Sequence, residues 1–340
     1  MAMSAIFLMC SERSGSNLIT RMFDAHRDCC GPSPSHLIRV LAENRHRYGD
    51  LSAERNWETL LQDAADLLAT KLGSWRRDWT TQQLRTACPE RDLKSLVRTV
   101  FGAEAAAAGK RRLFIKENHL YRYLPWVAQA FPGLKIVAMV RDPRDMALSW
   151  KHSPILRGDA VRAADIWWQD QMHLLRVIVS REYHVHLLRY EDLIREPEAE
   201  LQAVCRFANL EWDSAMTAFS DRAEASRDAA RTDDWKNLDR PVMNGNYRKW
   251  ATGLSPTEAA YVEAVCAEPM EALGYRREMD DPRTAEALAA ELLPLERHEK
   301  PGWQVVPATE KELRGARTEV LQRIRDRVPA TVEQEVPVHA

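Results

Sequence analysis

The 340-residue sequence lacks several features that would place it in a class at once. No apolar run approaches the roughly 20 residues that a membrane-spanning helix needs, and no charged segment precedes the short apolar start. The formal net charge is only −2, so no global field favours a nucleic acid or an anionic membrane as partner. These absences predict a cytoplasmic protein that binds neither nucleic acid nor membrane.

The sequence contains six cysteines, but no two of them have CxxC spacing. Cys29 and Cys30 are adjacent, which is a poor geometry for a disulfide between them. We therefore expect reduced thiols. The sequence also contains no internal repeat and no cluster with metal-ligand spacing, so it predicts no metal.

The most informative stretch that is present is SERSGSNL at residues 11–18, between an apolar run at 5–10 and an amphipathic segment. This order predicts a strand, a turn and a helix. Gly15 allows close approach of the backbone to a ligand, and the unpaired amides of the helix N-terminus suit a phosphate. The stretch is not a Walker A loop, because Ser16-Asn17 stand where a Lys-Ser/Thr pair would be needed.

A second anion site is predicted downstream, where the apolar run at 134–140 leads into RDPRDMALS at 141–149. Pro143 suits the first turn of a helix, and Arg141 stands at the carboxyl end of the expected strand. Ligands bind at that edge of an open parallel sheet, and Ser149, about two turns into the helix, can share the side of Arg141. Together the two sites indicate one ligand with two separated phosphate groups.

These motifs resemble those of the sulfotransferase superfamily, which uses 3′-phosphoadenosine 5′-phosphosulfate (PAPS). RSGSN at 13–17 is similar to the family's first loop, and RDPRD followed by a serine is similar to its second motif. The further matches, in order, are FIK at 114–116, FP at 131–132, RYEDL at 189–193 and NYRKW at 246–250. The resemblance covers about residues 4–276 and is greatest to the bacterial and tyrosylprotein-type branches.

The resemblance implies transfer of a sulfuryl group from PAPS to a hydroxyl, with 3′,5′-adenosine bisphosphate (PAP) as product. A sulfuryl group carries one negative charge, so its transfer can proceed without a metal ion. By the same resemblance, Arg13 and Lys116 contact the transferring group. The implied donor-binding residues are Arg13, Ser14, Gly15, Ser16, Asn17, Leu18, Arg141, Ser149, Tyr190, Arg248 and Lys249.

The general base is where the sequence departs from the family pattern. Tyrosylprotein-type enzymes carry a glutamate after the first helix, but residues 30–36 read CGPSPSH and contain no carboxylate. Cytosolic-type enzymes carry a histidine two residues after the catalytic lysine, where this chain has Asn118. The candidates for the base are therefore His36 first, then His119, then Glu117, since histidine titrates in the useful range.

The alternation of apolar runs and amphipathic segments predicts an α/β fold, and the resemblance makes it P-loop-like, with three layers around a parallel sheet. We expect Asp159 to cap the longest helix. The expected strands are 4–10, 112–116, 134–140 and 184–189, and the expected helices are 16–27, 120–130, 143–151, 160–181 and 197–208.

The chain is predicted to form a sulfotransferase domain at 1–276 and a charged helical extension at 277–340. Within the domain, a helical insertion at 36–109 is a candidate wall for the acceptor site, and the polar segment 220–248 is expected to close over the nucleotide. In the extension, helices are expected at 286–297 and 310–327, followed by a disordered end from Val328.

Two other functions stay open at this point: a P-loop kinase for a small molecule and a noncatalytic nucleotide-binding protein. The sequence also does not choose among acceptors, which include a small molecule, a sugar and a peptide tyrosine. It leaves the oligomeric state open, a homodimer included.

Overall fold

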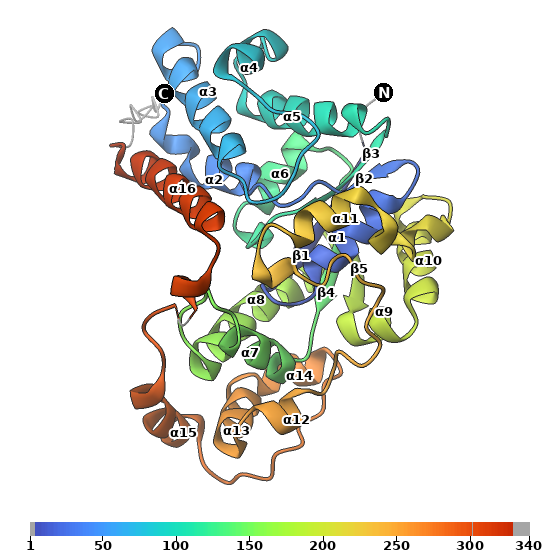
Figure 1. Cartoon of the computed structure of the whole chain (residues 1–340), viewed down its shortest axis with the longest axis vertical. Coiled ribbons are helices and arrows are strands. Elements are labelled where there is room, and N and C mark those ends of the chain that lie inside the picture. The colour runs from blue at the N-terminus through green and yellow to red at the C-terminus, as the bar shows by residue number, and fades with distance from the viewer. Residues whose placement is uncertain (1–3, 301, 329–340) are drawn as a thin grey trace, which may run out of the picture.

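A five-stranded parallel sheet forms the centre of the molecule in the computed structural model, which describes residues 4–300 and 302–328 (Figure 1). The strand order is β2-β3-β1-β4-β5. The strands are β1 (Ser4–Cys10), β2 (Cys29–Cys30), β3 (Arg112–Lys116), β4 (Lys135–Val140) and β5 (His184–Arg189). The predicted α/β fold is confirmed. β2 was not predicted, because two residues carry no detectable periodicity.

Both faces of the sheet are buried, as the alternation of side chains along β1 shows. Phe7 and Met9 belong to one hydrophobic cluster, and Ile6 and Leu8 belong to another. Successive side chains of a strand point to opposite faces, so each cluster fills one side of the sheet. The first cluster is shared with the helices α2 (Leu37–Asn44), α3 (Glu54–Ala69), α5 (Leu93–Ala107) and α8 (Ala160–Ser180), and the second with α1 (Ser16–Ala25), α9 (Tyr190–Arg195) and α10 (Pro197–Ala208).

The helices agree with most of the predicted ranges. The predicted helix 120–130 is divided into a 3₁₀ turn (Leu120–Arg122) and α6 (Leu124–Ala130), because Pro125 starts a helix but cannot continue one. Asp159 stands at the N-cap position of α8 as expected, but its side chain makes no capping hydrogen bond and instead pairs with Arg297. Besides α6, the α-helices between β1 and β5 are α1 (Ser16–Ala25), α2 (Leu37–Asn44), α3 (Glu54–Ala69), α4 (Thr81–Ala87), α5 (Leu93–Ala107), α7 (Pro143–Lys151) and α8 (Ala160–Ser180).

After β5 the described part of the chain contains helices joined by turns and irregular segments, and no further strand. The expected helix 286–297 ends earlier, at Leu292, and a 3₁₀ turn containing Pro294 follows it. The elements are α9 (Tyr190–Arg195), α10 (Pro197–Ala208), α11 (Ala223–Ala229), η5 (Asp233–Trp235), α12 (Trp250–Gly253), α13 (Pro256–Val265), α14 (Ala267–Ala272), α15 (Ala285–Leu292) and α16 (Ala308–Asp326). In the described ranges, no helix combines the length and the apolar character that a membrane span requires.

The last helix, α16, packs on α2 and α3, which are among the first helices of the chain (Figure 1). Arg323 and Arg327 both bind the buried carboxylate of Asp63 on α3, at 2.9 and 2.7 Å. The predicted disordered end begins at Val328, and all of it after that residue lies outside the described residues.

The sheet order creates a crevice at the carboxyl ends of the strands. From central β1 the chain continues to β2 and β3 on one side, whereas β4 and β5 lie on the other side. Connections that diverge in this way leave a gap at the carboxyl edge, where ligands bind in open α/β sheets. The motifs at 13–17, 141–149 and 189–193 lie at or just after the carboxyl ends of β1, β4 and β5, and Lys116 ends β3 at the same edge.

Candidate active site

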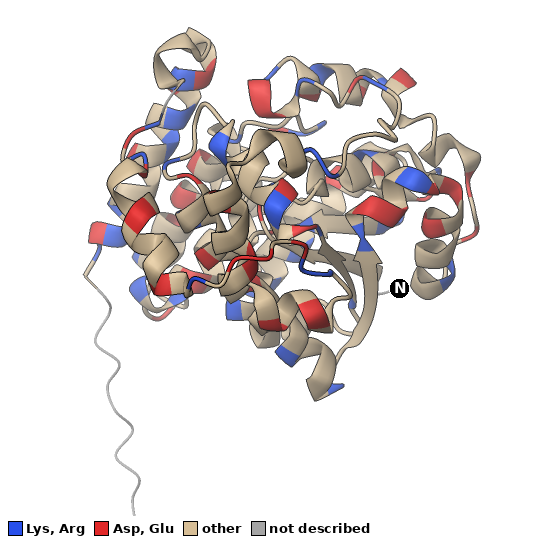
Figure 2. Cartoon of the chain, turned by 90° about the horizontal axis from the view of Figure 1, so that it is seen from below, with Lys and Arg blue, Asp and Glu red and all other residues tan. Residues whose placement is uncertain are grey.

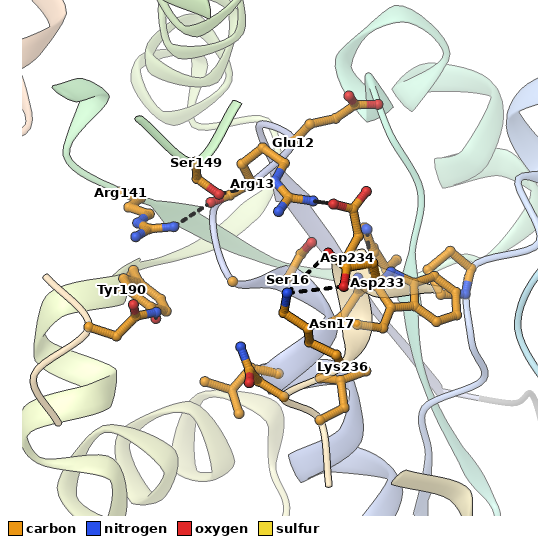
Figure 3. Close-up of a pocket in the computed structure, with 18 of the residues that line it drawn as sticks. Glu12, Arg13, Ser16, Asn17, Arg141, Ser149, Tyr190, Asp233, Asp234 and Lys236 are labelled. Atoms are coloured by element: carbon orange, nitrogen blue, oxygen red, sulfur yellow. Dashed lines mark hydrogen bonds and ion pairs between the residues drawn. The ribbon is translucent and has the colours of Figure 1, made fainter. Parts of the chain in front are cut away.

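A cavity of about 570 Å³ opens at this edge of the sheet (Figure 3). It collects most of the site residues predicted from the sequence. Those that line it are Arg13, Gly15, Ser16, Asn17, Leu18, His36, Lys116, Arg141, Ser149, Tyr190 and Lys249. Ser14 and Glu117 are buried and do not line it, and neither His119 nor Arg248 does.

The turn between β1 and α1 depends on Gly15, whose φ of +83° lies in the left-handed region. A Cβ atom on this residue would lie 2.5 Å from the ring of Tyr190, so no side chain fits there. α1 begins at the next residue, and its first backbone amides have no partner within the helix. The turn is therefore built to present amides and the positive end of a helix to an anion.

Arg13 connects the two predicted anion sites. Its Nε donates to Ser149 Oγ at 3.1 Å, and its carbonyl oxygen accepts from Arg141 Nη1 at 2.8 Å (Figure 3). Its Nη1 also lies 2.9 Å from Oδ1 of Asp234. The loop after β1 and the loop and helix after β4 thus form one continuous polar surface.

The β5 side of the cavity is closed by Tyr190, the first residue of α9. The guanidinium of Arg141 lies over its ring, 4.6 Å from the centroid. The Tyr190 hydroxyl accepts from Asn246 Nδ2 at 2.6 Å, which ties the later polar segment to the site. Burial raises the pKa of Tyr190, so this residue stays a neutral phenol.

Asp145 anchors the segment that carries Lys249. Its carboxylate accepts from the backbone amides of Arg248 and Trp250, at 2.6 and 3.0 Å. Lys249, between them, lines the cavity, whereas the Arg248 guanidinium pairs with Glu278 and does not. The structure therefore does not bring the Arg248 side chain together with the other donor-binding candidates.

Lys116 ends β3 and lines the cavity. Its Nζ donates to Asn17 Oδ1 at 3.1 Å, which places the ammonium beside the first turn of α1. Burial lowers its pKa, and the neighbouring Cys10 and Glu12 oppose the shift. Lys116 and Arg13 are thus two cations on either side of the glycine turn.

His36 and Glu117 face one another from the ends of neighbouring segments. Nδ1 of His36 lies 3.6 Å from Oε2 of Glu117, too far for a hydrogen bond, and neither atom has another partner in the described part of the chain. The second oxygen of Glu117 accepts from the amide of Ile38 at 3.3 Å, near the start of α2. This contact holds the carboxylate behind the imidazole.

The environment favours neutral forms of both groups. Burial raises the pKa of Glu117 to about 7, against the opposing effect of Arg39. Burial, assisted by the positive charges of Arg39 and Arg317, lowers the pKa of His36 well below its usual range. The imidazole is therefore unprotonated near neutral pH, which is the form that can accept a proton.

His119 lies apart from this pair. Its Nδ1 is 3.4 Å from both Asp170 Oδ1 and the Tyr121 hydroxyl, and it lines a second, smaller cavity of about 260 Å³. The structure thus groups the first and third candidates for the base with Lys116, and it separates the second.

Several lining residues were not predicted from the sequence. Asp233 and Asp234 enter from η5, Lys71 follows α3, and Arg314 and Arg317 come from α16. Their local sequences give no sign of this, because each is an ordinary charged residue in a polar segment. In residues 4–300 and 302–328, no three His, Cys, Asp or Glu side chains are grouped as metal ligands would be.

The comparisons with known proteins agree with one another. A family model described as "Sulfotransferase family" matches residues 5–214. The chain is 23% identical over 308 residues to nodulation protein NoeE of Sinorhizobium fredii, which covers 82% of this chain and 68% of that protein. It is 24% identical over 286 residues to protein-tyrosine sulfotransferase 1 of Danio rerio, with 80% and 72% covered.

Among solved structures, the sulfotransferase domain of the Synechococcus PCC 7002 olefin synthase is similar in fold. The TM-score is 0.57 at 17% sequence identity, and the match covers 81% of this chain and 96% of that domain. The architecture around the cavity is therefore one that sulfotransferases share.

Proposed function

Because the chain belongs to the sulfotransferase family, we propose that it transfers a sulfuryl group from PAPS to a hydroxyl of its acceptor. The observation that carries the proposal is the contact of Arg13 with both Ser149 and Arg141. This contact joins the glycine turn and the second anion site within one cavity, as a ligand with two separated phosphates requires.

Each end of the donor has residues suited to hold it. The amides at the start of α1, from Ser14 to Asn17, face the 5′-phosphate. Arg141 and Ser149 hold the 3′-phosphate, and the guanidinium fork gives paired donors for it. Tyr190 and Lys249 enclose the nucleotide between α9 and the segment fixed by Asp145.

The bound donor supplies an activated sulfuryl group on its 5′-phosphate. In the transfer, the acceptor oxygen forms a bond to sulfur as the bond from sulfur to the bridging oxygen breaks. The bridging electron pair stays on PAP. Lys116 and Arg13 stabilise the negative charge that develops on the bridging and sulfuryl oxygens. The neutral imidazole of His36 receives the hydroxyl proton, and the ionised form of Glu117, which is populated near its pKa of about 7, stabilises the resulting imidazolium.

The acceptor is a hydroxyl compound. The residues that bind the donor do not determine whether it is a small molecule, a sugar or a peptide tyrosine. One relative is named a protein-tyrosine sulfotransferase and the name of the other, a nodulation protein, states no acceptor, so the relatives do not fix the acceptor of this chain. Acceptor choice must therefore lie in the part of the cavity beyond Lys116 and His36.

A thermal-shift comparison tests the proposal. PAP without metal, ATP with magnesium and 5′-AMP are added separately to the purified chain. We expect the largest rise in melting temperature with PAP, because only PAP fills both anion sites. A larger rise with magnesium-ATP would favour a small-molecule kinase. PAP binding without transfer of labelled sulfur to any hydroxyl in a broad acceptor panel would favour a noncatalytic protein.

A further inference from the structure

Three cations line the cavity beyond His36, and none belongs to a predicted motif. Lys71 follows α3, and Arg314 and Arg317 lie on α16, which is outside the residues matched by the family model. Positive and negative residues are otherwise interspersed over the molecule (Figure 2), so a group of like charges at one end of a cavity is a local feature.

Arg317 is held by backbone oxygens alone. Its Nη1 donates to the carbonyl of Leu67 at 2.9 Å, and its Nη2 donates to the carbonyl of Ser35 at 2.5 Å. Among the described residues, no carboxylate lies within 4 Å of its guanidinium. Burial lowers its pKa to about 10, which shows that its charge is poorly solvated.

Lys71 and Arg314 have only limited compensation. The Lys71 side chain is 8% exposed, and its Nζ donates to the carbonyl of Leu68 at 2.8 Å. Its carboxylate neighbour, Asp78, is 97% exposed and 3.7 Å away. Arg314 uses Nε to bind the buried Glu310 at 2.7 Å, and its two Nη groups make no hydrogen bond within the described ranges.

The position of these cations relates them to the acceptor and not to the donor. Arg317 bonds to Ser35, the residue before His36, on the side of the sheet where β2 and β3 end. The donor groups Arg141 and Tyr190 follow β4 and β5, on the opposite side of β1. A ligand group bound by Arg317 therefore lies beside the candidate base.

Buried cations with few carboxylate partners are costly unless an anion joins them. The carboxylates nearby are already engaged: Glu310 binds Arg314, Asp233 binds Lys236, and Glu117 lies behind His36. An anionic ligand would supply the missing charge at this end of the cavity.

We propose that Lys71, Arg314 and Arg317 bind an oxyanion on the acceptor and so hold its hydroxyl beside His36. This inference rests on the proposed sulfuryl transfer, and it narrows the acceptor to hydroxyl compounds that carry a carboxylate or a sulfate-like group. It also gives α16 a role in acceptor selection, because two of the three cations are on that helix.

The test uses the full chain saturated with PAP, so that the donor anion sites are filled. Saturation-transfer NMR measures the binding of 4-hydroxybenzoate against its neutral analogue 4-hydroxybenzamide. A second arm compares 4-hydroxybenzenesulfonate with 4-hydroxybenzenesulfonamide. We expect the anion of a pair to bind about tenfold tighter, as charge-assisted hydrogen bonds predict. A preference in either arm supports the inference and shows which oxyanion fits.

Matched variants then assign the preference to these residues. Arg317→Gln, and separately Lys71→Gln, should reduce the preference for the anion over its neutral analogue to less than about threefold, while PAP affinity stays unchanged. Arg325→Gln, an exposed position on α16, should leave it intact. Unchanged PAP affinity shows that a variant is folded, and having two variants keeps the test valid if one is not.

Two failures are distinguishable. If PAP does not bind the wild-type chain, the proposed function itself fails. If PAP binds but both members of each pair bind equally, or none of the probes binds, the donor site stands and the oxyanion inference is overturned.

Discussion

The two halves of the cavity are built in different ways. In the donor half, the three cations Arg13, Lys116 and Arg141 lie at or shortly after the ends of β1, β3 and β4. In the acceptor half, the lining residues come from α16, from the end of α3 and from the turn before α2, which are far apart in the sequence.

This difference shows which features of a site the sequence can predict. Parallel strands bring their carboxyl ends to one edge of the sheet. Residues that follow different strands therefore lie close together, however many residues separate them in the sequence. No such rule predicts which residues are brought together when α16 packs on α2 and α3. We expect the donor half to set the chemistry and the acceptor half to set the specificity, and the following variants test that division.

The largest effect is expected for Lys116→Ala. Loss of a cation placed where charge develops should lower kcat by about 10²- to 10³-fold while PAP binding stays largely intact. The assay is transfer of labelled sulfur, with PAP affinity measured in parallel. Lys135→Ala, at the amino end of β4 and therefore at the other edge of the sheet, is the matched control. Turnover of the Lys116 variant at the wild-type rate would remove its assigned role.

The next largest effect is expected for His36→Ala. Removal of a general base should lower kcat by about 10²-fold, because base catalysis commonly contributes at least that much. His119→Ala is the control, since His119 lines the other cavity and should retain near wild-type transfer. The reverse outcome, in which only the His119 variant loses activity, would identify His119 as the base and contradict the role proposed for His36.

Glu117→Gln should have a smaller effect on rate, and its pH dependence shows whether Glu117 is the base. We expect kcat to fall about tenfold, as for the loss of a group that supports the base. The wild-type rate should be maintained down to pH values below the ordinary histidine pKa, because burial and nearby arginines lower that of His36. At those pH values Glu117 is already a neutral acid, because burial raises its pKa to about 7, so the acid limb should lie at the same pH in the Gln variant.

If Glu117 itself were the base, the pH profile would differ. The wild-type acid limb would then lie near pH 7, at the raised pKa of this carboxyl, and it would disappear in the Gln variant. An acid limb that is kept in the Gln variant therefore indicates a residue that positions the base, and an acid limb near pH 7 that is lost indicates the base itself.

The smallest effect is expected for Asp234→Asn. Asp234 lies 2.9 Å from Arg13 and places a negative charge where the donor is proposed to bind. Removal of that charge should tighten PAP binding by about three- to tenfold, measured by isothermal titration calorimetry. Asp233→Asn removes the same charge from a residue that pairs with Lys236, and it should have less effect. Weaker PAP binding in the Asp234 variant would show that this residue positions Arg13 and does not compete with the donor.

Sequence reasoning predicted the sheet better than the contacts around it. The strands at 4–10, 112–116 and 184–189 have the predicted bounds. β1 was recognisable because a buried parallel strand is a continuous apolar run, whereas β5 is a largely exposed edge strand. Arg13, Lys116 and Arg141 meet in one cavity, as expected for residues at one sheet edge.

The misses have physical reasons. The side chain of Arg248 turns to Glu278, which is 30 residues away and could not be inferred as its partner. Asp159 pairs with Arg297 across the fold, so a good capping residue was used in a tertiary contact. The approach of α16 to His36 depends on ion pairs with Asp63, and no local pattern reports such pairs.

The central claim is that the glycine turn and Arg141 bind two ends of one donor. Calorimetric affinities of PAP and 5′-AMP for the wild type and Arg141→Ala test it most directly. We predict that PAP binds the wild type at least about tenfold tighter than 5′-AMP, and that the variant loses this advantage while its affinity for 5′-AMP is unchanged. Equal affinities of the two nucleotides for the wild type, or equal losses of both in the variant, would contradict the account.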